Sequence, residues 1–257
     1  MLSKIEIDTF IERGFLKVEG AFSSELASMA RDILWKDLPC DQHDRTTWTS
    51  PVIRLDYYTQ EPFVRAINTP LLHQAFDQLV GKGRWFPRDR VGTFPVRFPS
   101  DKKANDTGWH ADASFEGEDG SWRINVASKG RALLMLFLFS DIGIDDAPTR
   151  ILVGSHLDIP KLLMPYDEEG LSFIELAQKL TTTLDRDIET ATGSAGTVYL
   201  CHPFLIHAAQ DNIIGSPRFL AQPPLLPSEP ITINRDDNNY SPVEIAIRKG
   251  LGFSSTP

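Results

Sequence analysis

The feature that most constrains the fold is a set of short apolar runs in the second half of the chain, separated by turn residues. The longest run, ALLMLFLF at 132–139, has the length of a strand and falls far short of the roughly 18 apolar residues of a membrane-spanning helix. No regular alternation of strand and helix connects these runs, which indicates antiparallel pairing. We therefore predict a mainly β, jelly-roll core with flanking α-helices. The expected strands are 93–98, 132–139, 150–153, 197–200 and 218–221.

Four segments have apolar residues at helical spacing and are predicted to be helices: 22–35, 70–80, 170–180 and 241–250. Capping and stop residues set most of their ends. Met29 is expected on the apolar face of helix 22–35, and Phe173 on that of helix 170–180. In helix 70–80, Thr69 is the expected N-cap, Pro70 the first residue and Gly81 the stop. In helix 241–250, Ser241 and Glu244 are expected to form a capping box and Gly250 to end the helix.

Length and charge limit the class of protein. A chain of 257 residues suits one domain, with N-terminal helices over about 1–85, the jelly-roll core over about 86–225 and the C-terminal helix over about 241–250. The formal net charge of −9 argues against nucleic-acid or anionic-membrane partners. The N-terminus does not resemble a signal peptide, and Cys40 and Cys201 are too few for a disulfide framework. We expect a cytoplasmic protein.

The stretch TGWHADASF at 107–115 places His110 and Asp112 two residues apart, so in a strand both side chains point to the same face. Such a pair is common by chance, and a histidine hydrogen-bonded to its neighbouring carboxylate explains it as simply as a metal site does. A calcium loop starting at Asp112 fails, because its twelfth position is Arg123 instead of a glutamate.

The segment HPFLIH adds His202 and His207 as rival partners for this pair. Two histidines and one carboxylate form a facial triad, which leaves three coordination positions open and suits non-haem Fe(II). The remaining three histidines are expected to be structural: His43 in a loop, His73 on the second helix, and His156 in a turn that it braces.

Arg218 follows His207 by eleven residues across a turn-rich segment. In a hairpin of that length it would lie on the strand that returns past His207, where its guanidinium could bind a carboxylate through two hydrogen bonds. An arginine in a strand is otherwise usually a solvated residue, and that alternative stays open on the spacing alone.

Three motifs together resemble the phytanoyl-CoA dioxygenase family: WHAD, then RALLMLFLFSDI with APTRILVGSH, then GTVYLCHPFLIHAAQDN with GSPR. The resemblance covers about 10–252, including a glycine-phenylalanine strand and a helix near the N-terminus. It implies an Fe(II)- and 2-oxoglutarate-dependent oxygenase built on a double-stranded β-helix, the cupin-like form of the jelly roll.

The resemblance assigns roles to particular residues. His110, Asp112 and His207 match the metal ligands of the family, with His202 as the rival third ligand, and Arg218 matches the arginine that binds the distal carboxylate of 2-oxoglutarate. Two departures concern the other cosubstrate contacts: Ala209 stands where some members have serine, and DDAPTR replaces an acidic-asparagine-glycine run. Thr149 and Arg97 are the candidate substitutes for those contacts.

The implied reaction uses Fe(II), 2-oxoglutarate and O₂, releases succinate and CO₂, and oxidises a small-molecule metabolite or natural-product intermediate. Related halogenases carry a small residue in place of the carboxylate, so Asp112 favours hydroxylation or a related oxidation such as desaturation, ring formation or demethylation. One alternative is a non-redox metal-binding sensor or small-molecule binding protein on the same barrel, which has no need for Arg218. Another is a structural domain that tolerates Asp112→Ala.

Four residues around the triad are candidates for the substrate pocket. Trp109 and Phe115 flank the HAD segment, while Trp122 and Asn125 belong to an acid-rich excursion at 113–131. We expect this excursion to form a lid or substrate loop; a solvated surface excursion is the alternative.

Overall fold

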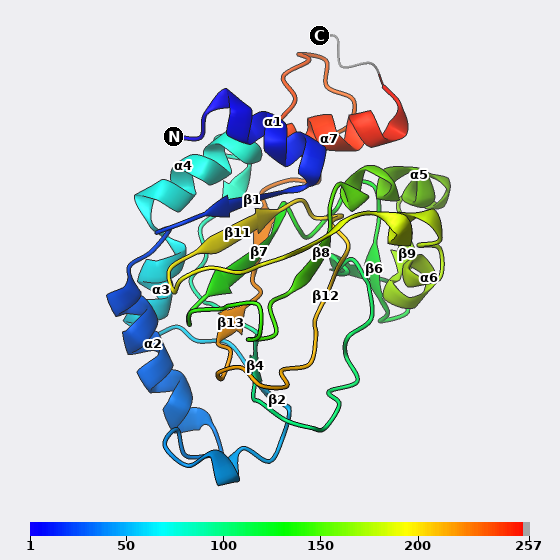
Figure 1. The fold of residues 1–257 in the computed structure, drawn as a ribbon. Coiled ribbons are helices and arrows are strands. Elements are labelled where there is room, and N and C mark those ends of the chain that lie inside the picture. The colour runs from blue at the N-terminus through cyan, green and yellow to red at the C-terminus, as the bar shows by residue number, and fades with distance from the viewer. Residues whose placement is uncertain (254–257) are drawn as a thin grey trace.

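A computed structural model describes residues 1–253, in which two antiparallel sheets pack face to face (Figure 1). In the larger sheet, β1, β11 and β7 are neighbours; β13 and β14 both pair with the other edge of β7, and β3 lies beyond β14. The strands are β1 (Phe15–Val18), β2 (Val52–Leu55), β3 (Trp85–Phe86), β4 (Phe94–Arg97), β5 (Phe115–Glu116), β6 (Trp122–Ile124), β7 (Leu133–Leu138), β8 (Arg150–Leu152), β9 (Leu171–Ser172), β10 (Ile188–Thr190), β11 (Val198–Cys201), β12 (His207–Ala208), β13 (Leu220–Ala221) and β14 (Pro224–Pro227).

The smaller sheet has the order β10-β8-β12, and a bridge between His110 and His207 adds the HAD segment to its edge. The pair β2–β4 is joined to the larger sheet by a bridge between Arg97 and Arg218. All of these pairings are antiparallel. The predicted mainly β, cupin-like core is confirmed.

Strand β7 explains why the longest apolar run shows no polar alternation. All six of its residues are buried. Leu133, Met135 and Phe137 pack into the core beneath the helices, whereas Leu134, Leu136 and Leu138 pack between the two sheets. A strand covered on both faces has no solvent side on which polar residues could be placed.

The helices lie outside the sheets. Figure 1 shows α2, α3 and α4 along one side of the larger sheet, and α1 beside α7. None of the helices in the described part of the chain is long and apolar enough to cross a membrane. The α-helices are α1 (Lys4–Arg13), α2 (Ser24–Asp37), α3 (Glu61–Ile67), α4 (Pro70–Leu79), α5 (Ile159–Leu163), α6 (Phe173–Ala177) and α7 (Pro242–Leu251), and the 3₁₀ helices are η1 (Arg45–Thr47), η2 (Ser155–Leu157), η3 (Met164–Tyr166) and η4 (Thr182–Asp185).

The helix expected over 170–180 is shorter than predicted. It begins only at Phe173, because Leu171 and Ser172 pair with β6 as strand β9 and the Ser172 hydroxyl then caps α6. Phe173, at the first position of the helix, is 42% exposed instead of buried on the apolar face. The face that does pack on the core carries Leu176.

Two further helix expectations were wrong in detail. Gly250 lies inside α7, which ends at Leu251 and is capped by Gly252 with φ 88°. A side chain at Gly250 would place its Cβ 2.6 Å from the Leu157 carbonyl oxygen, so this glycine permits close packing and does not end the helix. Met29 is 47% exposed, because the buried face of α2 consists of Leu26, Ala27, Ala30 and Leu34. Helix α4 begins at Pro70 with Thr69 as its N-cap, as predicted, and ends at Leu79, one residue before the expected end, with Val80 as its C-cap ahead of Gly81.

Candidate functional site

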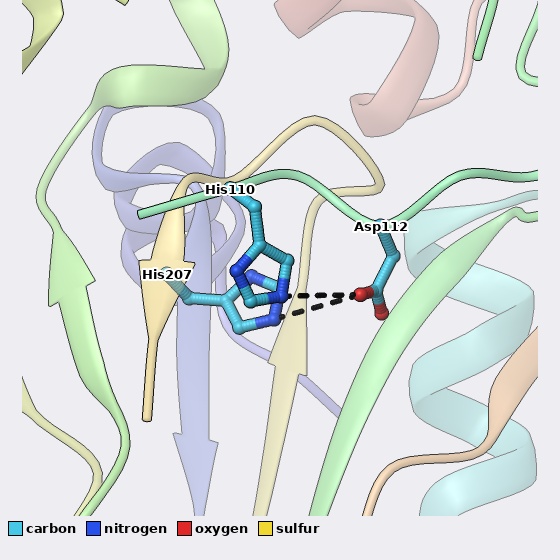
Figure 2. Close-up of side chains that lie close together, drawn as sticks. All are labelled: His110, Asp112 and His207. Carbon is cyan, nitrogen blue, oxygen red and sulfur yellow. Dashed lines mark ion pairs between the residues drawn. The ribbon is translucent and has the colours of Figure 1, made fainter. Parts of the chain in front are cut away.

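His110 and His207 are direct neighbours on adjacent strands (Figure 2). Each backbone N–H donates to the carbonyl oxygen of the other residue, at 3.0 and 2.9 Å. A hydrogen-bonded antiparallel pair directs both side chains to the same face, and the two ring centroids are 4.5 Å apart. The two imidazoles are therefore brought together by strand register.

Each imidazole is oriented by its own backbone. Nδ1 of His110 donates to the Gly108 carbonyl oxygen at 2.9 Å, and Nδ1 of His207 donates to that of Leu205 at 3.1 Å. In a neutral imidazole, a proton on Nδ1 leaves Nε2 unprotonated. Both Nε2 atoms point toward Oδ1 of Asp112, at 3.6 and 3.8 Å, as Figure 2 shows.

The three side chains have the donor set and spacing of a metal site. One donor atom from each of His110, Asp112 and His207 lies within 4.8 Å of the others. Nε2 of His207 is buried and has no hydrogen-bond partner among the described residues. Two imidazoles and one carboxylate suit a divalent metal such as Fe(II), with coordination positions left open.

Burial and neighbouring charges favour the metal-binding forms of His207 and Asp112, whereas Asp112 favours the protonated form of His110. Burial, together with the charge of His110, lowers the pKa of His207 to about 4, so this ring is neutral at pH 7. Burial also disfavours the charged forms of Asp112 and His110, but their neighbours reverse its effect. Arg131 and the two histidines hold the pKa of Asp112 below its usual range, and the Asp112 carboxylate raises that of His110.

The three side chains of the triad differ in exposure. The side chains of His110 and Asp112 are 22% and 27% exposed, whereas that of His207 is 2% exposed. The ring of Phe173 lies edge-on to His110, with centroids 5.2 Å apart. Because Phe173 is itself partly exposed, it lies where a ligand would approach the open side.

The spacing suggested that Arg218 lies on a strand that pairs with the strand of His207. The structure places it elsewhere. The connection after β12 crosses to the other sheet, where the backbone of Arg218 pairs with that of Arg97. Both arginines are 1% exposed. The two side chains therefore enter the core as neighbours on adjoining strands.

This arginine pair has more positive charge than its surroundings neutralise. Arg97 donates to Oδ1 of Asp106 at 2.7 Å, and Arg218 donates to the Ala147 carbonyl oxygen at 2.6 Å. Nε and Nη1 of Arg97 and Nε of Arg218 are buried without acceptors among the described residues. Burial and the charge of Arg97, opposed by Asp106, lower the pKa of Arg218 to about 9.

The rival ligand His202 is excluded from the triad by its hydrogen bonds. Its Nδ1 accepts from the Phe204 N–H at 3.1 Å, and its Nε2 donates to the Val243 carbonyl oxygen at 3.2 Å. Its ring lies beside that of His156, whose Nε2 donates to the Ile11 carbonyl oxygen. These two histidines join α1 and α7 to the core. His43 lies in a loop and His73 on α4, as predicted.

The proposed pocket residues are spread more widely than expected. The Trp109 ring packs under the Arg150 guanidinium at 4.8 Å, on the opposite face of the strand from His110. The excursion at 113–131 folds into β5 and β6, which pair with β9. Within it, Phe115 packs against Lys129, Trp122 is 60% exposed, and Asn125 is buried with its amide donating to Glu168. Their role in substrate binding stays a prediction.

Two residues beside the triad were missed by the sequence interpretation. Phe173 was assigned to a buried helix face, and Arg131 received no role, although its Nη1 lies 3.4 Å from Oδ2 of Asp112. Both reach the site from segments that contact it only in the folded chain.

The predicted cosubstrate contact Thr149 is 2% exposed next to the first residue of β8, and its carbonyl oxygen accepts a hydrogen bond from the Ala191 N–H.

The sequence model of phytanoyl-CoA dioxygenase matches residues 10–219, which is most of the chain. The chain belongs to this family. No curated protein sequence gives a significant match. The matched segment contains the three residues of the triad and Arg218.

Solved structures with this fold have been crystallised with metals and 2-oxoglutarate. HygX from Streptomyces hygroscopicus, with nickel, 2-oxoglutarate and hygromycin B bound, has a TM-score of 0.58 and 18% identity over 88% of both chains. EctD from S. alaskensis, with 2-oxoglutarate and 5-hydroxyectoine bound, has a TM-score of 0.56 and 20% identity over 91% of this chain and 78% of its own. The epimerase SnoN from nogalamycin biosynthesis has a TM-score of 0.56 and 15% identity over 85% of this chain and 80% of its own. At these identities the likeness shows a shared fold.

Proposed function

We propose that this protein is an Fe(II)- and 2-oxoglutarate-dependent oxygenase that hydroxylates, or otherwise oxidises, a small-molecule metabolite or natural-product intermediate. The observation that carries the proposal is Nε2 of His207, buried without a partner and directed at the space shared by Nε2 of His110 and Oδ1 of Asp112. A buried polar atom left unpaired costs about 1 to 3 kcal/mol. A metal ion in that space would satisfy all three donors.

His110, Asp112 and His207 would hold the iron and leave the remaining positions for 2-oxoglutarate and O₂. The oxidant is O₂, which the bound iron would activate; 2-oxoglutarate, converted to succinate and CO₂, would give two of the four electrons that O₂ accepts, and the substrate the other two. The protein fixes both imidazoles through their Nδ1 hydrogen bonds and keeps His207 neutral, so that the donors need no rearrangement on binding.

Arg218 would bind the distal carboxylate of 2-oxoglutarate, with Arg97 beside it. The pair has two buried positive charges, one adjacent carboxylate from Asp106, and guanidinium nitrogens without acceptors. A carboxylate of the cosubstrate would supply the missing charge and acceptors. Thr149, buried at the start of β8, is a further candidate contact.

The substrate would approach from the open side of the triad, past Phe173. Apolar contact at that point would help to exclude water from the metal. Hydroxylation or a related oxidation is preferred over halogenation, because Asp112 supplies a carboxylate at the position that related halogenases leave free for chloride. EctD, crystallised with 5-hydroxyectoine, and the epimerase SnoN are consistent with more than one reaction on this fold.

The test is succinate release with Fe(II), ascorbate, O₂ and 2-oxoglutarate, with a panel of small-molecule substrates. The wild type is compared with Asp112→Ala and Arg218→Ala, and His73→Gln serves as a folded histidine control away from the site. We expect succinate from the wild type and the control, and a loss of at least about 100-fold in both site variants.

A second measurement, binding of 2-oxoglutarate in the presence of Mn(II), distinguishes the rival functions without turnover. A protein that binds Mn(II) but not 2-oxoglutarate would be a non-redox metal-binding protein. A protein that binds neither would be a structural domain, and the oxygenase proposal would be wrong.

A further inference from the structure

Arg131 lies on the far side of Asp112 from the two histidines. Its Nη1 is 3.4 Å from Oδ2 of Asp112, while both histidine Nε2 atoms face Oδ1. The two oxygens of one carboxylate are thus directed to different neighbours: one toward the triad and the other toward a guanidinium. No other described cation forms an ion pair with Asp112 apart from the two histidines.

The guanidinium has few other partners. Arg131 is 9% exposed, and its Nη2 donates to the Ala113 carbonyl oxygen at 3.1 Å. Its Nε and Nη1 are buried without a hydrogen-bond acceptor among residues 1–253. A shift of about 0.5 Å would bring Nη1 within normal hydrogen-bond distance of Oδ2. Arg131 is therefore placed to bind Asp112 when that carboxylate is drawn into a coordination shell.

The backbone around Arg131 is tied to the segment that bears Asp112. Ser128 donates its hydroxyl to the Arg131 carbonyl oxygen at 2.7 Å and closes a tight turn. Gly130 passes so close to the HAD segment that an added Cβ would lie 1.8 Å from the Ser114 carbonyl oxygen. Only glycine permits this approach, which holds the end of the excursion against the ligand segment.

We propose that Arg131 is a positioning residue, which binds Oδ2 of Asp112 and so presents Oδ1 alone to the metal. A carboxylate held in this way occupies one coordination position instead of two and leaves room for a chelating cosubstrate. The inference rests on the proposed metal site and adds a residue that controls its geometry. Partners that orient a metal ligand typically contribute 10- to 100-fold to metal affinity or activity.

The experiment measures Mn(II) affinity and, under anaerobic conditions, the visible charge-transfer absorption of the Fe(II)–2-oxoglutarate complex. The variants are Arg131→Gln and Arg131→Lys, with Arg123→Gln as the matched control. Arg123 lies on the same excursion and pairs with Asp119 and Glu169 near the surface. Circular dichroism and thermal unfolding establish that each variant is folded.

We expect Arg131→Gln to weaken Mn(II) binding about 10-fold or more and to weaken or shift the charge-transfer absorption, with partial rescue by Arg131→Lys. Arg123→Gln should match the wild type. Gly130→Ala tests the same contact without removing a charge, and it should also weaken Mn(II) binding.

The proposal would be overturned if Arg131→Gln had the Mn(II) affinity and the charge-transfer absorption of the wild type. Tighter Mn(II) binding by Arg131→Gln would also overturn it. Equal thermal destabilisation by Arg131→Gln and Arg131→Lys, with an unchanged charge-transfer absorption, would show a structural role only. A wild type that binds no Mn(II) would instead refute the proposed function, so the two failures are distinguishable.

Discussion

Replacement of Arg218 by methionine should make the ligand-free protein more stable while abolishing its response to 2-oxoglutarate. Arg218 is fully buried beside Arg97, and its pKa is lowered from the ordinary 12.5 to about 9. At 1.36 kcal/mol for each pH unit, this lowering corresponds to a penalty of about 5 kcal/mol for the charged side chain in the folded state. Both the folded and the unfolded forms are protonated at pH 7, so the whole penalty applies there.

The substitution also has a cost. Arg218 donates to the carbonyl oxygens of Ala147 and Pro95, and losing these bonds leaves buried acceptors unpaired, at about 1 to 3 kcal/mol. The balance favours Arg218→Met by about 2 to 4 kcal/mol, in line with the replacement of other buried charges by apolar side chains. Arg97→Met is the matched comparison. It should be less stable than Arg218→Met, because it removes the buried partner of Asp106.

Urea unfolding of the metal-free and Mn(II)-loaded forms, with and without 2-oxoglutarate, measures both effects. At 100 times its dissociation constant, the ligand should stabilise the wild type by about 2.7 kcal/mol and leave Arg218→Met unchanged. The reasoning fails if Arg218→Met is less stable than the wild type by more than about 2 kcal/mol and still gains stability from 2-oxoglutarate.

Two further predictions concern the buried histidine pair and the open side of the site. Burial lowers the pKa of His156 to about 4 and also lowers that of His202, so the unfolded chain binds more protons than the folded protein between about pH 4 and 6.5. Stability is then lost as the pH falls below 6.5, and His156 alone contributes a loss of about 1.4 kcal/mol at pH 5.5. Urea unfolding at pH 7.5 and 5.5 should show a smaller loss in His156→Gln, and an equal loss would exclude this source. Phe173→Ala should raise KM for the substrate about 10-fold and leave Mn(II) affinity unchanged, because Phe173 contacts the exposed edge of His110 and supplies no ligand; a change in Mn(II) affinity alone would contradict this placement.

The sequence was most informative where function depends on local spacing. His110 and Asp112 are two residues apart, so their relation could be inferred before the fold was known. The choice of His207 over His202 could not be made from the residues alone, because it depends on the register between β12 and the HAD segment. The structure shows that His202 is occupied by α7 and its own turn.

Other parts of the site depend on contacts between distant segments. Arg131 and Phe173 approach the triad from the end of the 113–131 excursion and from α6, and no periodicity in the sequence indicates such contacts. Helix α1 was missed although the sequence carries its signals: Ser3 and Glu6 form a capping box, and Ile7, Phe10 and Ile11 have helical spacing. Gly250 was misread as a stop, because the approach of Leu157 is visible only in the packed structure.

The most direct test of the metal-site account is anaerobic titration of the Fe(II)-loaded protein with 2-oxoglutarate, followed by visible absorption. The account predicts a charge-transfer absorption in the wild type and in His73→Gln, and its loss in His207→Ala, whose missing imidazole removes one of the three donors. An absorption that persists unchanged in folded His207→Ala, or that never forms in the wild type, would contradict the assignment of the triad.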